Sequence, residues 1–266
     1  MSYVKTQVKD FWNRRPCGTE VTTEEKYSIP YFEHIENYRY NVEPQIFSFA
    51  QFTRFHEKRV LEVGVGAGTD FLQWVRAGAR AYGIDLTPEG IEHVQQRLRL
   101  YGLKAEELRV ADAEFLPYPE DFFDLVYSWG VIHHSPNTIR ALEEMIRVTR
   151  PGGMCKIMVY NRHSLGAFYL WVKHALLKGR PWKSIPWCLY HFQESLGTKG
   201  YTAKEVAHIL RNYPVERVKI RSLKTYFDTL ELSKKRLWRA LGGILSYIFG
   251  EGHFGWFLTI EFTVRK

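Results

Sequence analysis

From residue 59 onward, short apolar runs alternate along the chain with segments whose apolar positions recur at helical spacing. A short apolar run between polar or glycine-rich residues is typical of a buried strand. Such runs predict strands at residues 60–63, 81–84, 108–110, 123–127, 154–160, 215–220 and 256–264. Because strands and helices alternate, we predict an α/β fold with a doubly wound, mostly parallel sheet that is covered on both faces.

Residues that favour helix ends divide the segments between these strands. Helical spacing predicts helices over residues 69–77 and 88–101. Ser135 and Pro136 fit a helix start, with serine as the N-cap and proline in the first helical position. That helix is predicted to end before the Pro-Gly-Gly sequence at 151–153.

The second half of the chain is less regular. No strand or helix pattern is clear between residues 161 and 200, which is too long for an ordinary connection in a compact domain. The alternation resumes with a helix predicted over 202–212, where Thr202 and Glu205 fit a capping box. A basic amphipathic stretch at 230–249 precedes the last strand.

These changes of pattern predict four segments. Residues 1–57 are rich in aromatic residues and predict a helical N-terminal cap, and residues 58–160 form the predicted core. Residues 161–200 are predicted to be an aromatic, basic insertion that acts as a lid on the substrate side. Residues 201–266 are predicted to complete the sheet, with the amphipathic stretch as an insertion.

Composition fits a globular protein, since 45% of the residues are hydrophobic and 25% are charged. The three cysteines (Cys17, Cys155 and Cys188) are widely spaced, which argues against a disulfide framework and a CxxC metal site. The N-terminus lacks the apolar run of a signal peptide, and the longest apolar stretches are too short to span a bilayer. We therefore expect a cytoplasmic protein.

Charge is unevenly distributed along the chain. Residues 1–150 carry a net charge of −4, whereas residues 151–266 carry +12 and five of the eight tryptophans. Nucleic acid is not favoured as a partner, because no RNA-binding module or basic tail is present. Residues 230–249, with Lys234, Lys235 and Arg236, could instead touch an anionic membrane surface, although a solvated helix face is the commoner explanation.

Three spaced glycines carry the first chemical signal. Gly64, Gly66 and Gly68 lie where the first strand turns into a helix, so that backbone amides can approach a ligand closely. Their spacing differs from the dinucleotide-binding pattern GxGxxG. Glu62, just before them, would repel a pyrophosphate but suits a ligand with an amino group and a sulfonium. Asp85 ends the second strand, where a carboxylate can accept hydrogen bonds from ribose hydroxyls.

The order and spacing of these motifs resemble the class I S-adenosylmethionine (SAM) methyltransferases, in particular a small-molecule branch that includes enzymes of ubiquinone and menaquinone biosynthesis. The resemblance covers about residues 58–160. It rests on the glycine motif that begins at Glu62, Asp85-Leu86, Asp112-Ala113-Glu114, Leu116-Pro117-Tyr118, Phe123-Asp124-Leu125-Val126, Gly130-Val131-Ile132-His133-His134, and Arg147-Val148-Thr149-Arg150-Pro151-Gly152-Gly153.

The resemblance implies a seven-stranded sheet whose last strand is antiparallel. It also implies a set of residues around the cofactor SAM, with Glu62 and the glycines at its methionine end, Asp85 at the ribose and Leu86 on the adenine. Asp112 and Ala113 would lie at the adenine edge, and Trp129 and Gly130 near the transferable methyl group. The full predicted set is Glu62, Gly64, Gly66, Gly68, Thr69, Asp85, Leu86, Asp112, Ala113, Glu114, Trp129 and Gly130.

Candidates for catalysis and substrate binding follow the fourth and fifth strands. His133 or His134 could take a proton from the substrate, or could shape the loop; of the two, His134 better fits the loop role and His133 the catalytic one. Tyr160 and Arg162 end the fifth strand at the predicted mouth of the site. The remaining substrate-binding candidates, from the N-terminal cap, are Tyr27 and Tyr31.

These features predict a metal-independent transfer of a methyl group from SAM to a small organic acceptor that is aromatic, apolar or anionic. Two alternatives remain open: SAM itself could be the substrate and release methylthioadenosine, or the chain could be a non-catalytic SAM-binding regulatory subunit. The polar run 194–200 fits either a substrate gate or a linker.

Overall fold

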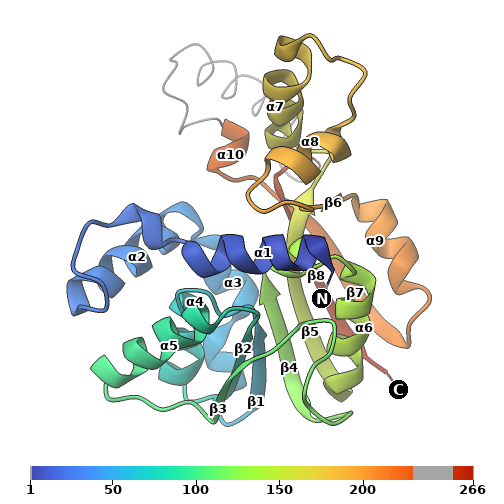
Figure 1. Cartoon of the computed structure of the whole chain (residues 1–266). Helices are drawn as coiled ribbons and strands as arrows, with labels where there is room; N and C mark the ends of the chain where they lie inside the picture. The colour runs from blue at the N-terminus through green and yellow to red at the C-terminus, as the bar shows by residue number, and fades with distance from the viewer. Residues whose placement is uncertain (1, 230–253, 266) are drawn as a thin grey trace.

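A mixed sheet forms the centre of the computed structural model, which describes residues 2–229 and 254–265 (Figure 1). Its strands follow the order β3-β2-β1-β4-β5-β8-β7, and a short strand, β6, pairs with β5. The strands are β1 (Arg59–Val63), β2 (Arg80–Asp85), β3 (Glu107–Val110), β4 (Phe123–Trp129), β5 (Thr149–Asn161), β6 (Gly200–Tyr201), β7 (Val215–Leu223) and β8 (Phe257–Val264).

Strand directions confirm the predicted doubly wound fold. Strands β1 to β5 run parallel to their neighbours, whereas β8 is antiparallel to both β5 and β7. The seven strands of the main path match the predicted number, and β6 adds an eighth from a segment without a clear pattern. Because the chain leaves β1 toward β2 and β3 and then returns to β4, the order reverses between β1 and β4, where open α/β sheets bind ligands.

Helices cover both faces of the sheet. The α-helices are α1 (Tyr3–Arg14), α2 (Ile29–Val42), α3 (Gln45–Ala50), α4 (Thr69–Arg76), α5 (Pro88–Leu100), α6 (Thr138–Val148), α7 (Leu165–His174), α8 (Ile185–Phe192), α9 (Ala203–Leu210) and α10 (Tyr226–Thr229). Four 3₁₀ turns accompany them: η1 (Thr19–Val21), η2 (Phe52–Phe55), η3 (Ile132–His134) and η4 (Leu176–Lys178). No helix in these described ranges is long and apolar enough to cross a membrane.

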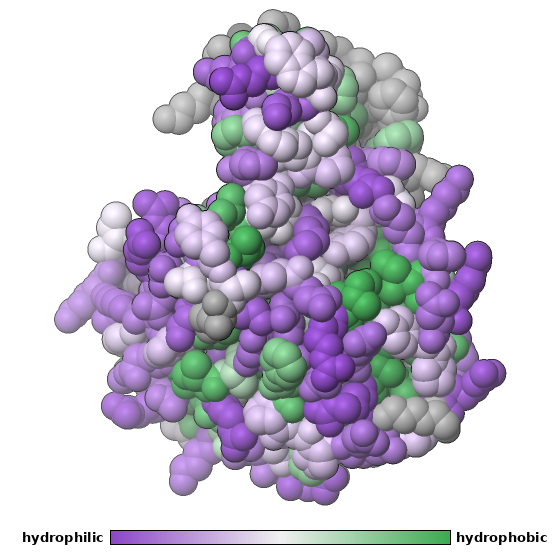
Figure 2. All heavy atoms as spheres, turned by 45° about the vertical axis from the view of Figure 1, so that its right-hand side comes forward, coloured by the Kyte–Doolittle hydropathy of each residue, from purple (hydrophilic) through white to green (hydrophobic). Residues whose placement is uncertain are grey.

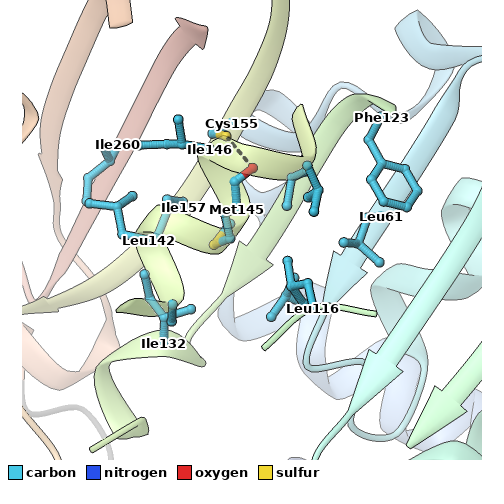
Figure 3. Packing of buried hydrophobic residues seen from close by; sticks show 14 of the residues in the cluster. Leu61, Leu116, Phe123, Ile132, Leu142, Met145, Ile146, Cys155, Ile157 and Ile260 are labelled. Atoms are coloured by element: carbon cyan, nitrogen blue, oxygen red, sulfur yellow. Dashed lines mark hydrogen bonds between the residues drawn. The ribbon is translucent and has the colours of Figure 1, made fainter. Parts of the chain in front are cut away.

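Side chains of the central strands point alternately to the two faces of the sheet, and each face has its own hydrophobic core. Leu61 of β1 belongs to the core on the face covered by α6 and α9, in which Leu142, Met145 and Ile157 lie close to one another (Figure 3). Val60, the preceding residue, packs on the opposite face with α3, α4 and α5. Most side chains of both cores are buried and therefore out of contact with solvent. This period of two is what a strand buried on both faces requires.

Two sequence predictions around α6 were wrong. Ser135 is not the N-cap of α6: the Asn137 side chain accepts a hydrogen bond from the Arg140 amide at 3.0 Å, and the Ser135 hydroxyl donates to Glu114 instead. The helix ends at Val148, before the Pro-Gly-Gly sequence, as predicted, but the strand expected from residue 154 starts earlier, because β5 already begins at Thr149. A shift of register against β4 between Phe123 and Leu125 absorbs the irregular residues, as a bulge does.

The segment without a clear pattern folds into a helical hairpin. Its two main helices, α7 and α8, pack against each other, and each begins at a serine N-cap. Ser164 accepts from the Ala167 amide at 3.0 Å, and Ser184 accepts from the Trp187 amide at 3.3 Å. The hairpin rises beyond the carboxyl ends of the parallel strands (Figure 1). The predicted amphipathic stretch at 230–249 lies outside the described residues, and the four segment boundaries remain predictions.

Candidate functional site

A cavity of about 220 Å³ opens at the carboxyl ends of β1, β2 and β4. Helix α1 runs across this edge of the sheet and contributes Lys5, Val8 and Trp12 to the wall (Figure 1). Ten of the twelve predicted cofactor residues line the cavity: Glu62, Gly64, Gly66, Thr69, Asp85, Leu86, Asp112, Ala113, Trp129 and Gly130. The structure therefore brings residues from four separate stretches of sequence into one space.

Each of the three glycines has a positive φ, but the side-chain space around them differs. Gly64 has φ +83°, and a Cβ there would lie 2.3 Å from Val131 Cγ2. Gly68 has φ +75°, and a Cβ there would lie 2.9 Å from Val94 Cγ2, so this glycine serves the packing of α4 on α5 and does not line the cavity. Gly66 has φ +50°, and the nearest atom to a Cβ would be Cys17 Cβ at 3.9 Å. A side chain at Gly66 would therefore be in ordinary van der Waals contact with Cys17, and both residues line the cavity.

Asp85 is held at the end of β2 by three donors. The Gly66 amide donates to Oδ2 at 3.0 Å, while the Thr87 amide and hydroxyl donate to Oδ1 at 2.9 and 2.7 Å. Burial raises the pKa of Asp85, and these hydrogen bonds oppose part of that rise. An ionised carboxylate has about four acceptor positions, so Asp85 retains capacity to accept from a ligand hydroxyl.

Glu62 has a buried carboxylate oxygen without a hydrogen-bond partner among the described residues. The residue is 4% exposed, and no group in residues 2–229 or 254–265 donates to its Oε2, although the Trp74 indole is near enough to favour the charged form. Burial and the nearby negative charge of Asp70 raise the pKa of Glu62 well above its usual value. Because buried polar atoms in native proteins are nearly always paired, an unpaired acceptor in a cavity wall indicates a donor that arrives with a ligand. The ammonium group of a methionine moiety is such a donor.

An ion-pair cluster joins helix α2 to the central sheet and helix α4. Arg39 Nη2 lies 3.2 Å from Asp70 Oδ2, and Arg39 Nη1 lies 3.6 Å from Glu43 Oε2. The Trp129 indole donates to Glu43 at 2.8 Å, and the Tyr127 hydroxyl donates to Asp70 at 2.8 Å. This cluster fixes the N-terminal helices against the end of β4, so they form a permanent wall of the cavity.

A second cluster holds α1 over the predicted adenine end. Lys5 Nζ lies 2.7 Å from Asp112 Oδ2 and 2.5 Å from Glu114 Oε2. Burial opposes the charge on Lys5, but the hydrogen bonds to these two carboxylates outweigh it and raise its pKa. Glu114 also accepts from the Ser135 hydroxyl and from the Asn137 amide, and it does not line the cavity. The structure thus places Glu114 in a loop-organising position away from the predicted cofactor contacts.

At the opposite end of the cavity, three titratable side chains meet. The Tyr160 hydroxyl donates to both carboxylate oxygens of Glu194, at 3.0 and 2.9 Å, and His134 Nε2 lies 3.3 Å from Glu194 Oε2. Burial and the charge of Glu194 raise the pKa of Tyr160 well above its usual value, so this phenol stays protonated as a donor. Tyr160 is therefore a donor in this trio, and the groups that remain as possible proton acceptors are Glu194 and the His134 ring.

His134 is anchored through its other ring nitrogen. Nδ1 lies 2.9 Å from Thr198 Oγ1 and 3.0 Å from Ser195 Oγ. Because the Thr198 hydroxyl donates to the Ser195 carbonyl at 2.7 Å, its oxygen is free to accept from Nδ1–H. This hydrogen bond fixes the ring and ties the run 194–200 to the segment that follows β4.

His133, the predicted catalytic histidine, lies outside the cavity lining. It is fully buried, and neither of its ring nitrogens has a partner. Its ring packs against those of His134 and Tyr160, with centroids 4.3 and 4.1 Å away. Burial lowers the pKa of His133 well below its usual value, which keeps the ring neutral. His133 therefore packs in the interior, whereas His134 lines the cavity and contacts the run 194–200.

The three other predicted substrate contacts also lie outside the cavity lining. Tyr31 donates or accepts at 3.0 Å from His93 Nε2, and Tyr27 packs edge-on to the same ring, so both aromatics attach the N-terminal segment to α5. Arg162 pairs with Glu205 of the α9 capping box. Because β5 ends at Asn161, the alternation that places Tyr160 in the cavity no longer applies to Arg162.

Several cavity residues were not named as site residues from the sequence, although Glu194 begins the polar run 194–200 that fits a substrate gate. Lys5, Cys17, Arg39 and Glu43 come from the N-terminal segment, and Glu194 comes from the polar run before β6. None belongs to a spaced motif, and each reaches the cavity through contacts that are distant in sequence. Among the described residues, no group of three or more His, Cys, Asp or Glu side chains is arranged to hold a metal ion.

Comparison with known proteins covers the central part of the chain. Residues 61–157 match the family model described as "Methyltransferase domain". The phthiotriol/phenolphthiotriol dimycocerosates methyltransferase of Mycobacterium leprae is 42% identical over 98 residues, which are 36% of this chain and 35% of that protein. An uncharacterised protein of Mycobacterium tuberculosis is 38% identical over 103 residues, which are 39% of this chain and 37% of that protein. The chain thus spans about a third of the length of these curated relatives.

Solved structures share the whole fold at low sequence identity. Geranyl diphosphate C-methyltransferase from Streptomyces coelicolor superposes with a TM-score of 0.65 at 13% identity, over 98% of each chain. Phosphoethanolamine N-methyltransferase 2 of Haemonchus contortus gives a TM-score of 0.62 at 16% identity, over 97% of this chain and 60% of that chain. The narrower resemblance to quinone-biosynthesis enzymes remains a prediction. Residues 61–157 of this chain thus match a methyltransferase domain, and the fold around them is the one that these solved methyltransferases share.

Proposed function

We propose that this protein binds SAM in the cavity at the carboxyl ends of β1, β2 and β4 and transfers its methyl group to a small acceptor. The observation that carries the proposal is the buried Oε2 of Glu62, which has no hydrogen-bond partner among the described residues and lies in the same cavity wall as the glycine turn and Asp85. A carboxylate for the ammonium, a bare backbone turn and a carboxylate for the ribose fit one ligand together. Bound SAM supplies a methyl group that is already activated on a sulfonium sulfur.

Each wall of the cavity then has a part in holding that ligand. Asp85 accepts from the ribose hydroxyls, and Leu86 and Ala113 contact the adenine. Asp112 lies at the adenine edge, with Lys5 holding its other side. Trp129 and Gly130 end β4 and lie toward Tyr160 and Glu194, where the acceptor is expected. Because α1 and α2 enclose this space, they exclude water and hold the reactants together, which is the main contribution such an enzyme makes.

Glu194 is the proposed proton acceptor. Its side chain is 29% exposed and lines the cavity, while the Tyr160 hydroxyl orients its carboxylate. A hydroxyl or amine acceptor must lose a proton as it gains a methyl group, and a carboxylate at this end can take it. The acidic side chains Glu43 and Glu194 in this part of the wall do not favour the anionic acceptor that the basic composition suggested.

Turnover with labelled SAM tests the proposal. The full chain, incubated with methyl-labelled SAM and a metabolite extract, is expected to move label into a small molecule and to form S-adenosylhomocysteine in equal amount. Mass spectrometry of the products identifies the acceptor. Methylthioadenosine formed without any acceptor would instead make SAM the substrate, and SAM binding without any product would make the protein a regulatory subunit. Either result contradicts the proposal.

Cys17 provides an independent test of where the ligand lies. Its Cβ faces Gly66 of the glycine turn, and Arg39, Glu43 and Glu194 surround it in the same cavity. Cys17 is exposed, so N-ethylmaleimide can reach it. Desolvation in the cavity nevertheless raises the pKa of its thiol to about 12, so labelling should be slow at neutral pH and faster as the pH rises. Saturating S-adenosylhomocysteine is expected to slow the labelling about tenfold or more.

Background labelling should be small, because Cys155 and Cys188 are both fully buried. Cys17→Ser identifies the labelled residue, and free methionine at the same concentration controls for non-specific effects. If Cys17 reacts at the same rate with and without the nucleoside, the ligand does not occupy the space above Gly66.

A further inference from the structure

The hairpin of α7 and α8 ends in an exposed apolar tip. We define the tip as residues 173–183, which include η4 and the turn that leads to α8. Leu176 is 44% exposed, Leu177 is 66% exposed and Trp182 is 74% exposed. In Figure 2 the upper part of the molecule is a narrow projection above the body, so the tip stands clear of the sheet and its covering helices. Exposed apolar groups gathered in this way mark an interaction site.

The packing of the hairpin does not use these side chains. Its interior is formed by Ala175, Cys188 and Leu189, each fully buried. The tip nevertheless has a defined shape, because the Trp171 indole donates to the Lys183 carbonyl at 2.7 Å and the Arg180 amide donates to the Ala175 carbonyl at 2.9 Å. Three large apolar side chains are therefore held on the outside of an ordered turn.

The charge around the tip has a single sign. No Asp or Glu occurs between residues 163 and 193, whereas Lys173, Lys178 and Arg180 are exposed on the tip and Lys183 is half-buried. An exposed positive face of this kind attracts an anionic surface. The neighbouring side chains of Leu176 and Leu177 would make no favourable contact with a nucleic-acid backbone, because that backbone is polar and charged. Apolar side chains with basic residues beside them match the boundary of an anionic bilayer, where tryptophan is also enriched.

We infer that the tip docks on the surface of an anionic lipid bilayer, with Leu176, Leu177 and Trp182 entering the headgroup region and the basic side chains contacting lipid phosphates. The inference goes beyond methyl transfer and does not depend on the identity of the acceptor. Docking would also set the orientation of the cavity. Helix α7 packs against α10, whose Tyr226 and Phe227 line the cavity wall.

Sedimentation of the full chain with lipid vesicles tests the docking. We expect binding to vesicles of phosphatidylglycerol and phosphatidylcholine and much weaker binding to phosphatidylcholine alone. Lys178→Glu with Arg180→Glu reverses two tip charges and should lower the partition coefficient about tenfold or more, since each basic residue near the surface contributes to the attraction. Leu177→Ser with Trp182→Ser should have an effect of similar size, because it removes the apolar anchors.

Lys58→Glu with Lys104→Glu is the matched control. Both lysines are exposed and lie just before β1 and in the connection to β3, at the opposite edge of the parallel sheet from the hairpin. This pair makes the same change in net charge and is expected to shift the partition coefficient less than about twofold. Circular dichroism and thermal unfolding of each variant establish that the fold is kept.

Three results would overturn the inference. The wild-type chain could fail to sediment with anionic vesicles, which would leave the tip as a surface for another kind of partner. The control pair could weaken binding as much as the tip pair, which would make the attraction a matter of net charge alone. Binding could also persist in both tip variants, which would place the membrane contact elsewhere in the chain.

Discussion

Replacement of Asp85 by alanine is expected to lower the affinity for SAM about 100-fold. The carboxylate is proposed to accept hydrogen bonds from both ribose hydroxyls, and a hydrogen bond to a charged group contributes about 1.5–3 kcal/mol. Two such bonds amount to about 3 kcal/mol at the lower limit, which corresponds to roughly two factors of ten in the dissociation constant. Isothermal titration calorimetry with SAM and with S-adenosylhomocysteine measures the change.

The same substitution also releases the glycine turn, because Asp85 accepts from the Gly66 amide and from Thr87. Thr87→Ala separates the two effects. It removes the hydroxyl that donates to Asp85 at 2.7 Å and that caps α5 at the Gly90 amide, but it leaves the carboxylate in place. We expect Thr87→Ala to weaken binding only a few-fold. Equal losses in the two variants would mean that turn order, and not ribose recognition, accounts for the effect of Asp85.

Features set by neighbouring residues could be predicted from the sequence. The capping box of Thr202 and Glu205 forms as expected, with Thr202 accepting from the Glu205 amide at 3.2 Å. Strands β1, β2 and β4 lie where the apolar runs placed them, because a strand buried on both faces leaves an unmistakable run of apolar residues. The glycine turn and Asp85 converge on one cavity because both follow parallel strands, whose carboxyl ends share an edge.

Predictions from local signals were wrong where a distant partner decides the conformation. Serine is a favourable N-cap residue, yet the Ser135 hydroxyl donates a hydrogen bond to Glu114, and Asn137 caps the helix instead. Proline and glycine usually end an element, yet pairing with β4 carries β5 through Pro151 and Gly152. In each case a tertiary contact outweighs a weak local preference.

The acceptor end of the cavity was the least predictable part, because its groups come from segments far apart in the chain. Tyr160 was identified from the end of a strand, but Glu194 lies 34 residues later, beyond a hairpin that gave no clear helical pattern. The two histidines are adjacent, and only the direction of the η3 turn decides that His134 lines the cavity while His133 faces the interior. A sequence motif records neither kind of information.

Replacement of Glu194 by glutamine is expected to lower the rate of methyl transfer about 100- to 10,000-fold, the usual contribution of a positioned general base. The amide has almost the same size as the carboxylate and its oxygen can still accept from the Tyr160 hydroxyl, so the wall of the cavity should remain intact. The glutamine amide cannot, however, take up a proton from the methyl acceptor. The affinity for SAM should stay within a few-fold of wild type, because Glu194 lies at the acceptor end.

Glu143→Gln is the matched control for this substitution. Glu143 also accepts from a tyrosine hydroxyl, that of Tyr213 at 3.0 Å, but this pair lies outside the cavity lining. Removing its charge should leave both the transfer rate and the SAM affinity unchanged within about twofold. Incorporation of labelled methyl into the acceptor, measured with SAM saturating and acceptor varied, separates kcat from KM. A Glu194→Gln enzyme with wild-type kcat would show that the acceptor needs no carboxylate to take its proton, as for a nucleophile that reacts already deprotonated.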